Sequence, residues 1–230
     1  MRKFINWLKN CDIPILRDVR SFYISRRDRR LERLRLTFIP GLEKFFSGDV
    51  SIISNNCFAG RVYQDLHRPY LSPTAGLTIL YPDYIMFLEK LHFYRSAPLV
   101  WTNVSKYPRG EQMRKTWKHW YPIALIGGDL EVHFLHYTSR EEAEEKWRRR
   151  CNRINFDNIF VVAAAQGNCT EDMVARFTKL PYKKIFLVKE RYKIDYPDVV
   201  YVNEFVKDGA DPYRKAHVYY KYILNHFNGA

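Results

Sequence analysis

Long apolar runs are missing from this sequence. It begins MRKFINWLKN, and its first apolar run, from Phe4 to Leu8, ends at Lys9. Such a run is too short for the core of a signal peptide, and no run elsewhere approaches the roughly 20 residues that cross a bilayer. We therefore expect a cytoplasmic protein without a membrane-spanning helix.

Cysteine is scarce, and its spacing excludes two common roles. The chain has 4 cysteines, with no C-x-x-C pair: Cys11, Cys57, Cys151 and Cys169. This spacing fits a reducing compartment and carries no zinc signature, so we expect neither a structural disulfide nor a metal site. The sequence also lacks the G-x-x-x-x-G-K and G-x-G-x-x-G patterns. Their absence counts against a standard nucleotide-binding fold, and no cofactor can be identified.

Positive charge is plentiful. The sequence has 38 Lys and Arg against 25 Asp and Glu, a formal net charge of +13, which favours an anionic partner. Six arginines fall in one short stretch: Arg26, Arg27, Arg29, Arg30, Arg33 and Arg35. This stretch is either a solvated helix packed on the domain or a basic amphipathic helix that contacts lipid or phosphate. On the second interpretation, Arg26, Arg27, Arg29 and Arg30 attach the protein to the inner membrane surface.

Strands and helices alternate from Asp49 onward. Period-2 and continuous apolar patterns predict strands at 50–54, 76–80, 158–165, 183–190 and 198–205, and a hairpin over 121–137 that turns at Gly127 and Gly128. Helical spacing predicts helices at 61–67, 82–94, 139–154, 170–177 and 211–227. Three of these helices have N-cap residues, Ser139, Thr170 and Asp211.

This alternation indicates the fold class and the domains. We expect an α/β three-layer sandwich with a mostly parallel mixed sheet, to which the hairpin adds an antiparallel edge. The α/β domain should cover 47–230, after a basic helical N-terminal extension over 1–46. In such sheets ligands bind beyond the carboxyl ends of the strands.

The first candidate site is catalytic. Cys57 follows the strand at 50–54 and precedes a helix, where backbone amides lower the pKa of a thiol. Glu131 and His133 are two residues apart, so they share one face of a strand and can form an oriented base. The hypothesis is a set of Cys57, His133 and Glu131. The alternative is a packing cysteine and ordinary sheet histidines.

The second candidate site binds an anion or substrate. Asn55, Asn56 and Gly60 surround Cys57 in a loop whose amides would face a phosphate or a developing oxyanion. Asp129 and His136 come from the hairpin and would join the same site. A structural turn at the two asparagines explains the same residues.

Aromatic and basic residues interleave between 101 and 120, in WTNVSKYPRGEQMRKTWKHW. An exposed, irregular segment of this kind would line a cleft for a phosphate-bearing sugar or a nucleotide sugar. Nucleic acid is a less favoured partner for the same residues. A surface loop with its aromatic residues packed inward is the structural alternative.

Several blocks in order are similar to a known family: SIISNNCFAGRVYQDL, SPTAGL, PDYIMFLEKLHFY, YPIALIGGDLEVHFLHY and CTEDMVARFTKLPYKKIFL. Over residues 49–205 the chain resembles a bacterial family of unknown function, often labelled exopolysaccharide or capsular polysaccharide biosynthesis proteins. NNCFAG lacks the glycine pair common after the cysteine, and the arginine-rich stretch lies largely outside this resemblance.

The resemblance implies a role in surface polysaccharide biosynthesis. With the candidate sites, it leads us to expect a transferase or hydrolase that acts on a phosphate-bearing or lipid-linked sugar. The alternative is a non-enzymatic protein that binds an anionic glycan, a nucleic acid or a partner at the membrane surface.

Overall fold

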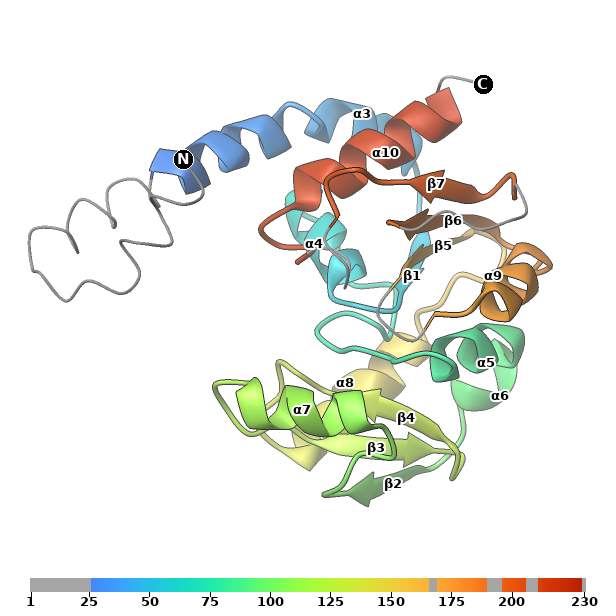
Figure 1. Ribbon diagram of the computed structural model, residues 1–230. Helices are drawn as coiled ribbons and strands as arrows, with labels where there is room; N and C mark the ends of the chain where they lie inside the picture. Colours follow the sequence, from blue (N-terminus) through green and yellow to red (C-terminus); the bar gives the residue numbers. More distant parts are fainter. Residues whose placement is uncertain (1–25, 166–168, 190–195, 206–210, 229–230) are drawn as a thin grey trace, which may run out of the picture.

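A four-stranded parallel sheet forms the centre of the molecule (Figure 1). The computed structural model describes residues 26–165, 169–189, 196–205 and 211–228. The strands lie in the order β1 (Ser51–Ser54), β5 (Ile159–Ala164), β6 (Lys183–Val188) and β7 (Val199–Tyr201). All three pairings are parallel. The predicted α/β class is therefore confirmed.

Helices cover both faces of this sheet (Figure 1). Side chains alternate along a strand, so Ile52 of β1 packs in one core and Ile53 in the other. The first core contains α3 (Ile39–Phe45), α4 (Phe58–Asp65) and α10 (Ala216–Asn228). The second contains α5 (Asp83–Glu89), α6 (Leu91–Tyr94), α8 (Arg140–Cys151) and α9 (Glu171–Thr178). These are the three predicted layers.

The hairpin belongs to a second sheet and does not extend the first. This antiparallel sheet has the order β2 (Leu99–Thr102), β3 (Ile123–Ile126) and β4 (Leu130–His133). Gly127 and Gly128 make the predicted turn, with φ of +64° and +88°, a conformation that favours glycine.

The predicted strand at 76–80 connects the two sheets instead. Thr78 exchanges backbone hydrogen bonds with His133 at 2.9 and 3.0 Å, and the Ile79 amide donates to the Asn55 carbonyl at 3.0 Å. Because this segment occupies the edge of β4 and the end of β1, the hairpin cannot join the parallel sheet there.

The stretch 101–120 is more regular than expected. It contains the end of β2 and the helix α7 (Pro108–Thr116), which starts with a proline that needs no intrahelical donor. Trp117 and Trp120 follow the helix and are exposed. Aromatic residues thus face solvent in the segment between α7 and β3.

Two of the three predicted helix caps are present. Ser139 accepts a hydrogen bond from the Glu142 amide, and Thr170 accepts one from the Met173 amide. Three expected ion pairs lie along α8: Glu142 with Lys146, Glu144 with Arg148, and Glu145 with Arg149. Asp211 caps a turn at Tyr213 and Arg214, so α10 begins later than predicted, at Ala216.

The arginine-rich stretch is helical from 26 to 36. The rest of the predicted helical extension, residues 1–25 with Cys11, lies outside the described residues. Arg35 is buried and pairs with the buried carboxylate of Asp65, which also accepts the Tyr220 hydroxyl at 2.6 Å. Across the part of the chain described, no helix combines the length and apolar character needed to cross a membrane.

Candidate functional site

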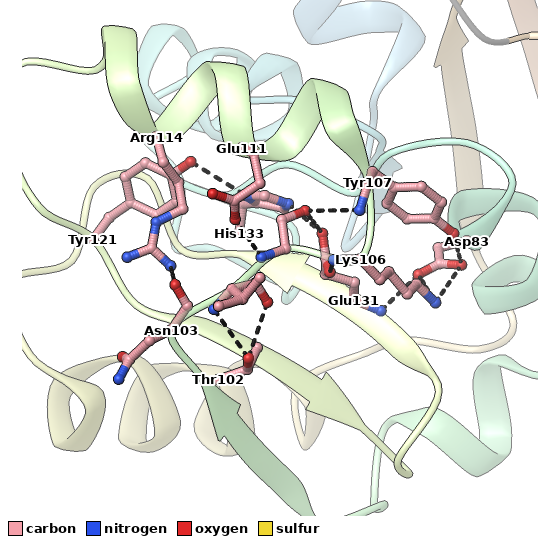
Figure 2. Close-up of polar contacts among 12 residues, drawn as sticks. Asp83, Thr102, Asn103, Lys106, Tyr107, Glu111, Arg114, Tyr121, Glu131 and His133 are labelled. Atoms are coloured by element: carbon pink, nitrogen blue, oxygen red, sulfur yellow. Dashed lines mark hydrogen bonds and ion pairs between the residues drawn. The ribbon is translucent and has the colours of Figure 1, made fainter.

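A buried polar network lies beneath α7 (Figure 2). We call it the Glu131 network; its members are Asp83, Ser105, Lys106, Tyr107, Tyr121, Glu131 and His133. The Glu131 side chain is 1 % exposed and accepts hydrogen bonds from the Ser105 hydroxyl, the Lys106 amide at 2.6 Å and the His133 Nε2 at 2.7 Å. Three donors therefore share the two oxygens of one carboxylate.

The hydrogen-bond donors around Glu131 determine the charge of its carboxylate. Burial raises the pKa of Glu131, but the hydrogen bonds from His133, Ser105 and Lys106 outweigh burial, and the pKa lies below the usual 4.5. Glu131 is therefore ionised at neutral pH. Because Nε2 of His133 donates to it, Nδ1 can accept from the Tyr121 hydroxyl at 3.2 Å.

Asp83 extends the network to a second carboxylate. Its side chain accepts from the Glu131 amide at 2.6 Å, the Tyr107 hydroxyl at 2.6 Å and the Lys106 ammonium at 2.8 Å. Burial and the hydrogen bond to Asp83 raise the pKa of Tyr107, which stays a neutral donor. These contacts tie the segment before α7 to α5 and β4.

Gly110 of α7 lies directly against the Glu131 network. A Cβ built on this residue would lie 2.0 Å from Ser105 Oγ and 2.8 Å from His133 Cε1. The backbone of α7 therefore rests directly on the network, and His133 is fully buried. The arrangement can orient Tyr121 and hold α7 in place, but it leaves no room for a substrate at His133.

Cys57 does not join Glu131 and His133. Its thiol points at the Leu77 carbonyl oxygen, 3.7 Å away, and packs in a small cluster with Tyr121 and Leu135. Burial, then the charge of Asp211, raises the pKa of Cys57 to about 12. The prediction of a lowered pKa is wrong, because the tertiary packing removes the thiol from water. Tyr121 takes the place expected for Cys57 beside His133.

We expect Cys57 to react with iodoacetamide more slowly than Cys169 in the native protein at neutral pH. Cys57 is 7 % exposed with a raised pKa, whereas Cys169 is half-buried, and alkylation requires an accessible thiolate. Mass spectrometry of labelling over time measures the two rates. Faster labelling of Cys57 would contradict the buried thiol and restore the nucleophile hypothesis.

Asn55 and Asn56 make structural contacts. The Asn55 side chain exchanges two hydrogen bonds of 3.0 Å with the backbone of Ala164, and so continues the sheet beyond the end of β1. Asn56 accepts from the Phe58 amide at 3.0 Å, and Ser54 accepts from the Ala59 amide at 3.0 Å. Two of the amides expected to face an anion are thus already bonded, which corrects the predicted loop site at Asn55, Asn56 and Gly60.

Asp129 and His136, the two hairpin residues of the second predicted site, lie in different places. Asp129 is exposed at the turn and accepts from the Tyr94 hydroxyl at 3.1 Å. His136 is exposed beyond β4, where burial of part of its ring lowers its pKa below 6.5. His136 lies in a cluster of aromatic and basic side chains, and of the other predicted site residues the buried Cys57 packs against two members of this cluster, Tyr121 and Tyr213.

We call this the Tyr213 cluster: Arg61, Trp117, Tyr121, His136 and Tyr213. The His136 ring centroid lies 5.9 Å from Trp117 and 6.3 Å from Tyr213. The Arg61 guanidinium lies 5.5 Å from the Tyr213 ring centroid, and Tyr121 is 6.2 Å from Trp117. Arg61 is in the first turn of α4, so the cluster lies beyond the carboxyl end of β1.

A pocket of about 190 Å³ adjoins the cluster. Tyr213, Arg214 and His217 line one side, and helix 26–36 supplies Asp28, Leu31, Glu32 and Arg35. The pocket is smaller than a typical cofactor site of roughly 300 Å³ or more and has room for one small group. Among the residues described, no His, Cys, Asp and Glu side chains form a group of three that would hold a metal ion.

The sequence carried little signal for the residues that were missed. Asp83, Ser105, Lys106 and Tyr121 come from three separate segments, and none belongs to a motif with Glu131. Tyr213 follows Asp211, the predicted helix cap, so its position in the sequence indicated the start of a helix and not a binding site. The interleaved aromatic residues of 101–120 were the one useful signal, because they include Trp117.

Two comparisons place the chain among known proteins. Residues 29–222 match the family described as "Domain of unknown function (DUF1919)". A Haemophilus influenzae protein described as "Uncharacterized protein" is 29% identical over 164 residues, which are 71% of this chain and 73% of that protein. Neither description mentions polysaccharide. The match starts at Arg29, so it takes in most of the arginine-rich helix, which the resemblance had left outside. The chain therefore belongs to this family of unknown function.

Proposed function

We propose that this protein binds a phosphate-bearing sugar in the cytoplasm, as part of surface polysaccharide biosynthesis. The Tyr213 cluster is the observation that carries the proposal. Its rings come from separate segments and meet at the carboxyl end of β1, the edge where ligands bind in parallel sheets.

The chemistry of the cluster suits such a ligand. A sugar ring presents an apolar face of C–H groups that packs on aromatic side chains such as Trp117 and Tyr213. The phosphate needs a cation, and the side chain of Arg214 is 75% exposed beside the adjoining pocket. Arg61 lies over the Tyr213 ring but already pairs with Asp65 at 3.2 Å, so it adds less. The net charge of +13 favours the same ligand at long range.

A transferase or hydrolase acting on that sugar is the second candidate, and His136 favours it. The imidazole is exposed in the cluster, and its lowered pKa keeps it neutral at pH 7, as a general base requires. The catalytic set of Cys57, His133 and Glu131 does not support this candidate, because all three side chains are buried and Cys57 points elsewhere.

We expect Trp117→Ala to weaken binding of glucose 1-phosphate or UDP-glucose at least about tenfold, a loss of roughly 1.4 kcal/mol. Isothermal titration calorimetry measures the dissociation constants. Trp120→Ala is the matched control, since Trp120 is also exposed after α7 but is not in the cluster. Equal affinity for unphosphorylated glucose, or an equal loss in both variants, would contradict the proposal.

The same mixtures test the second candidate. Release or transfer of the sugar should be detectable by chromatography and should fall roughly 100-fold or more in His136→Gln if His136 is the base. If the wild-type protein binds the sugar without releasing or transferring it, the binding function stands and the transferase or hydrolase function is rejected.

A further inference from the structure

Helix 26–36 is held on the domain by one charged face. Arg35 is buried against Asp65 and also pairs with Glu32. Asp65 in turn accepts from Arg61 and from the Tyr220 hydroxyl, so the contact reaches α4 and α10. The inward face of this helix is therefore determined, and with it the face that points to solvent.

The outward face is basic. Arg26, Arg29, Arg30 and Arg33 recur at helical spacing, are exposed and line one common hollow on the helix surface. Arg27 is not among the residues that line this hollow and pairs with Asp28 at 3.0 Å. Four arginines thus present positive charge in one direction.

Two leucines flank this basic face. Leu34 is 44% exposed and Leu36 is 52% exposed. At 100° per residue they lie on opposite sides of the stripe of arginines. Helices that lie in a membrane interface combine cations, which meet anionic headgroups, with apolar side chains, which enter the acyl boundary, and helix 26–36 exposes both kinds of side chain. A nucleic acid would use the arginines and leave both leucines in water.

We propose that helix 26–36 docks the protein on an anionic lipid bilayer. Arg30 and Arg33 bind headgroups, with Arg26 and Arg29 beside them, and Leu34 and Leu36 insert. The pocket that adjoins the Tyr213 cluster is lined by the inward face of the same helix, so the thickness of one helix separates the cluster from the docking surface. The further consequence, that the bound sugar is lipid-linked, rests on the proposed function.

The test is co-sedimentation of the full chain with vesicles. We expect binding to mixed phosphatidylglycerol and phosphatidylcholine vesicles but not to phosphatidylcholine alone, with a decrease as salt is raised. Arg30→Ser with Arg33→Ser should weaken binding more than tenfold, since each basic residue contributes roughly fivefold near an anionic surface. The matched control is Arg148→Ser with Arg149→Ser, which removes the same charge from the exposed side of α8.

One further variant, with both leucines replaced, makes the outcome decisive. Leu34→Ser with Leu36→Ser should leave charge-driven attachment partly intact at low salt but abolish the fraction that resists high salt. Equal losses in the two arginine variants, or unchanged binding in the leucine variant, would overturn the proposal. So would binding to RNA with no binding to vesicles. The Arg30 and Arg33 variant should still bind glucose 1-phosphate, so a failure of docking and a failure of sugar binding are distinguishable.

Discussion

Replacing Glu131 with glutamine is expected to lower the free energy of unfolding by about 3 kcal/mol. The wild-type carboxylate accepts from Ser105, Lys106 and His133 in a fully buried position. Glutamine has nearly the same shape but one acceptor oxygen, so its amide group must face a donor. Urea unfolding followed by circular dichroism measures the loss.

The control for this variant is Glu144→Gln on α8. Glu144 pairs with Arg148 at 2.7 Å on the surface, where both side chains are more than one third exposed. An exposed pair of this kind contributes about 0.5 kcal/mol or less. A similar loss in both variants would show that the Glu131 network contributes no more than an ordinary surface pair.

The pH dependence of the same variant tests the charge itself. The folded protein lowers the pKa of Glu131, so the ionised carboxylate stabilises the fold above the unfolded value of about 4.5. That contribution is lost as the pH falls through the folded pKa. The difference in stability between wild type and Glu131→Gln should therefore be largest at neutral pH and shrink below about pH 4.5. A constant difference would contradict an ionised Glu131.

Gly110→Ala is expected to cost about 3 kcal/mol. The added methyl group would lie 2.0 Å from Ser105 Oγ and 2.8 Å from Ser105 Cβ. Rotation of the serine hydroxyl cannot relieve the second contact, so α7 must move away from the network. Alanine's higher helix propensity returns at most about 1 kcal/mol. Thermal unfolding measures the net effect.

Gly60→Ala is the matched control for Gly110→Ala. Both glycines lie in helices, but a Cβ on Gly60 would meet Ala75 at 3.5 Å, an ordinary contact. This variant should be neutral or slightly stabilised, because alanine favours the helix. If Gly110→Ala were equally neutral, α7 would not rest on Ser105 and His133 as described.

Local patterns in the sequence predicted the layers correctly. A continuous apolar run at 158–165 became β5, one of the two inner strands, because a strand buried on both faces has no polar positions. Ser139 and Thr170 cap their helices because a cap depends only on residues within one turn. The pairing of Glu131 with His133 has the same local origin, since side chains two residues apart on a strand point to the same face of the sheet.

The tertiary structure alone decided how these elements work together. Whether the hairpin joins the parallel sheet depends on Thr78, which reaches it from another segment. The pKa of Cys57 depends on burial by Tyr121 and Leu135, which outweighs the local helix start. Tyr213 meets Trp117 through His136 only after three segments fold together. Contacts across long sequence separations and the removal of water are properties of the packed chain, and these two effects determine which side chains a ligand can reach.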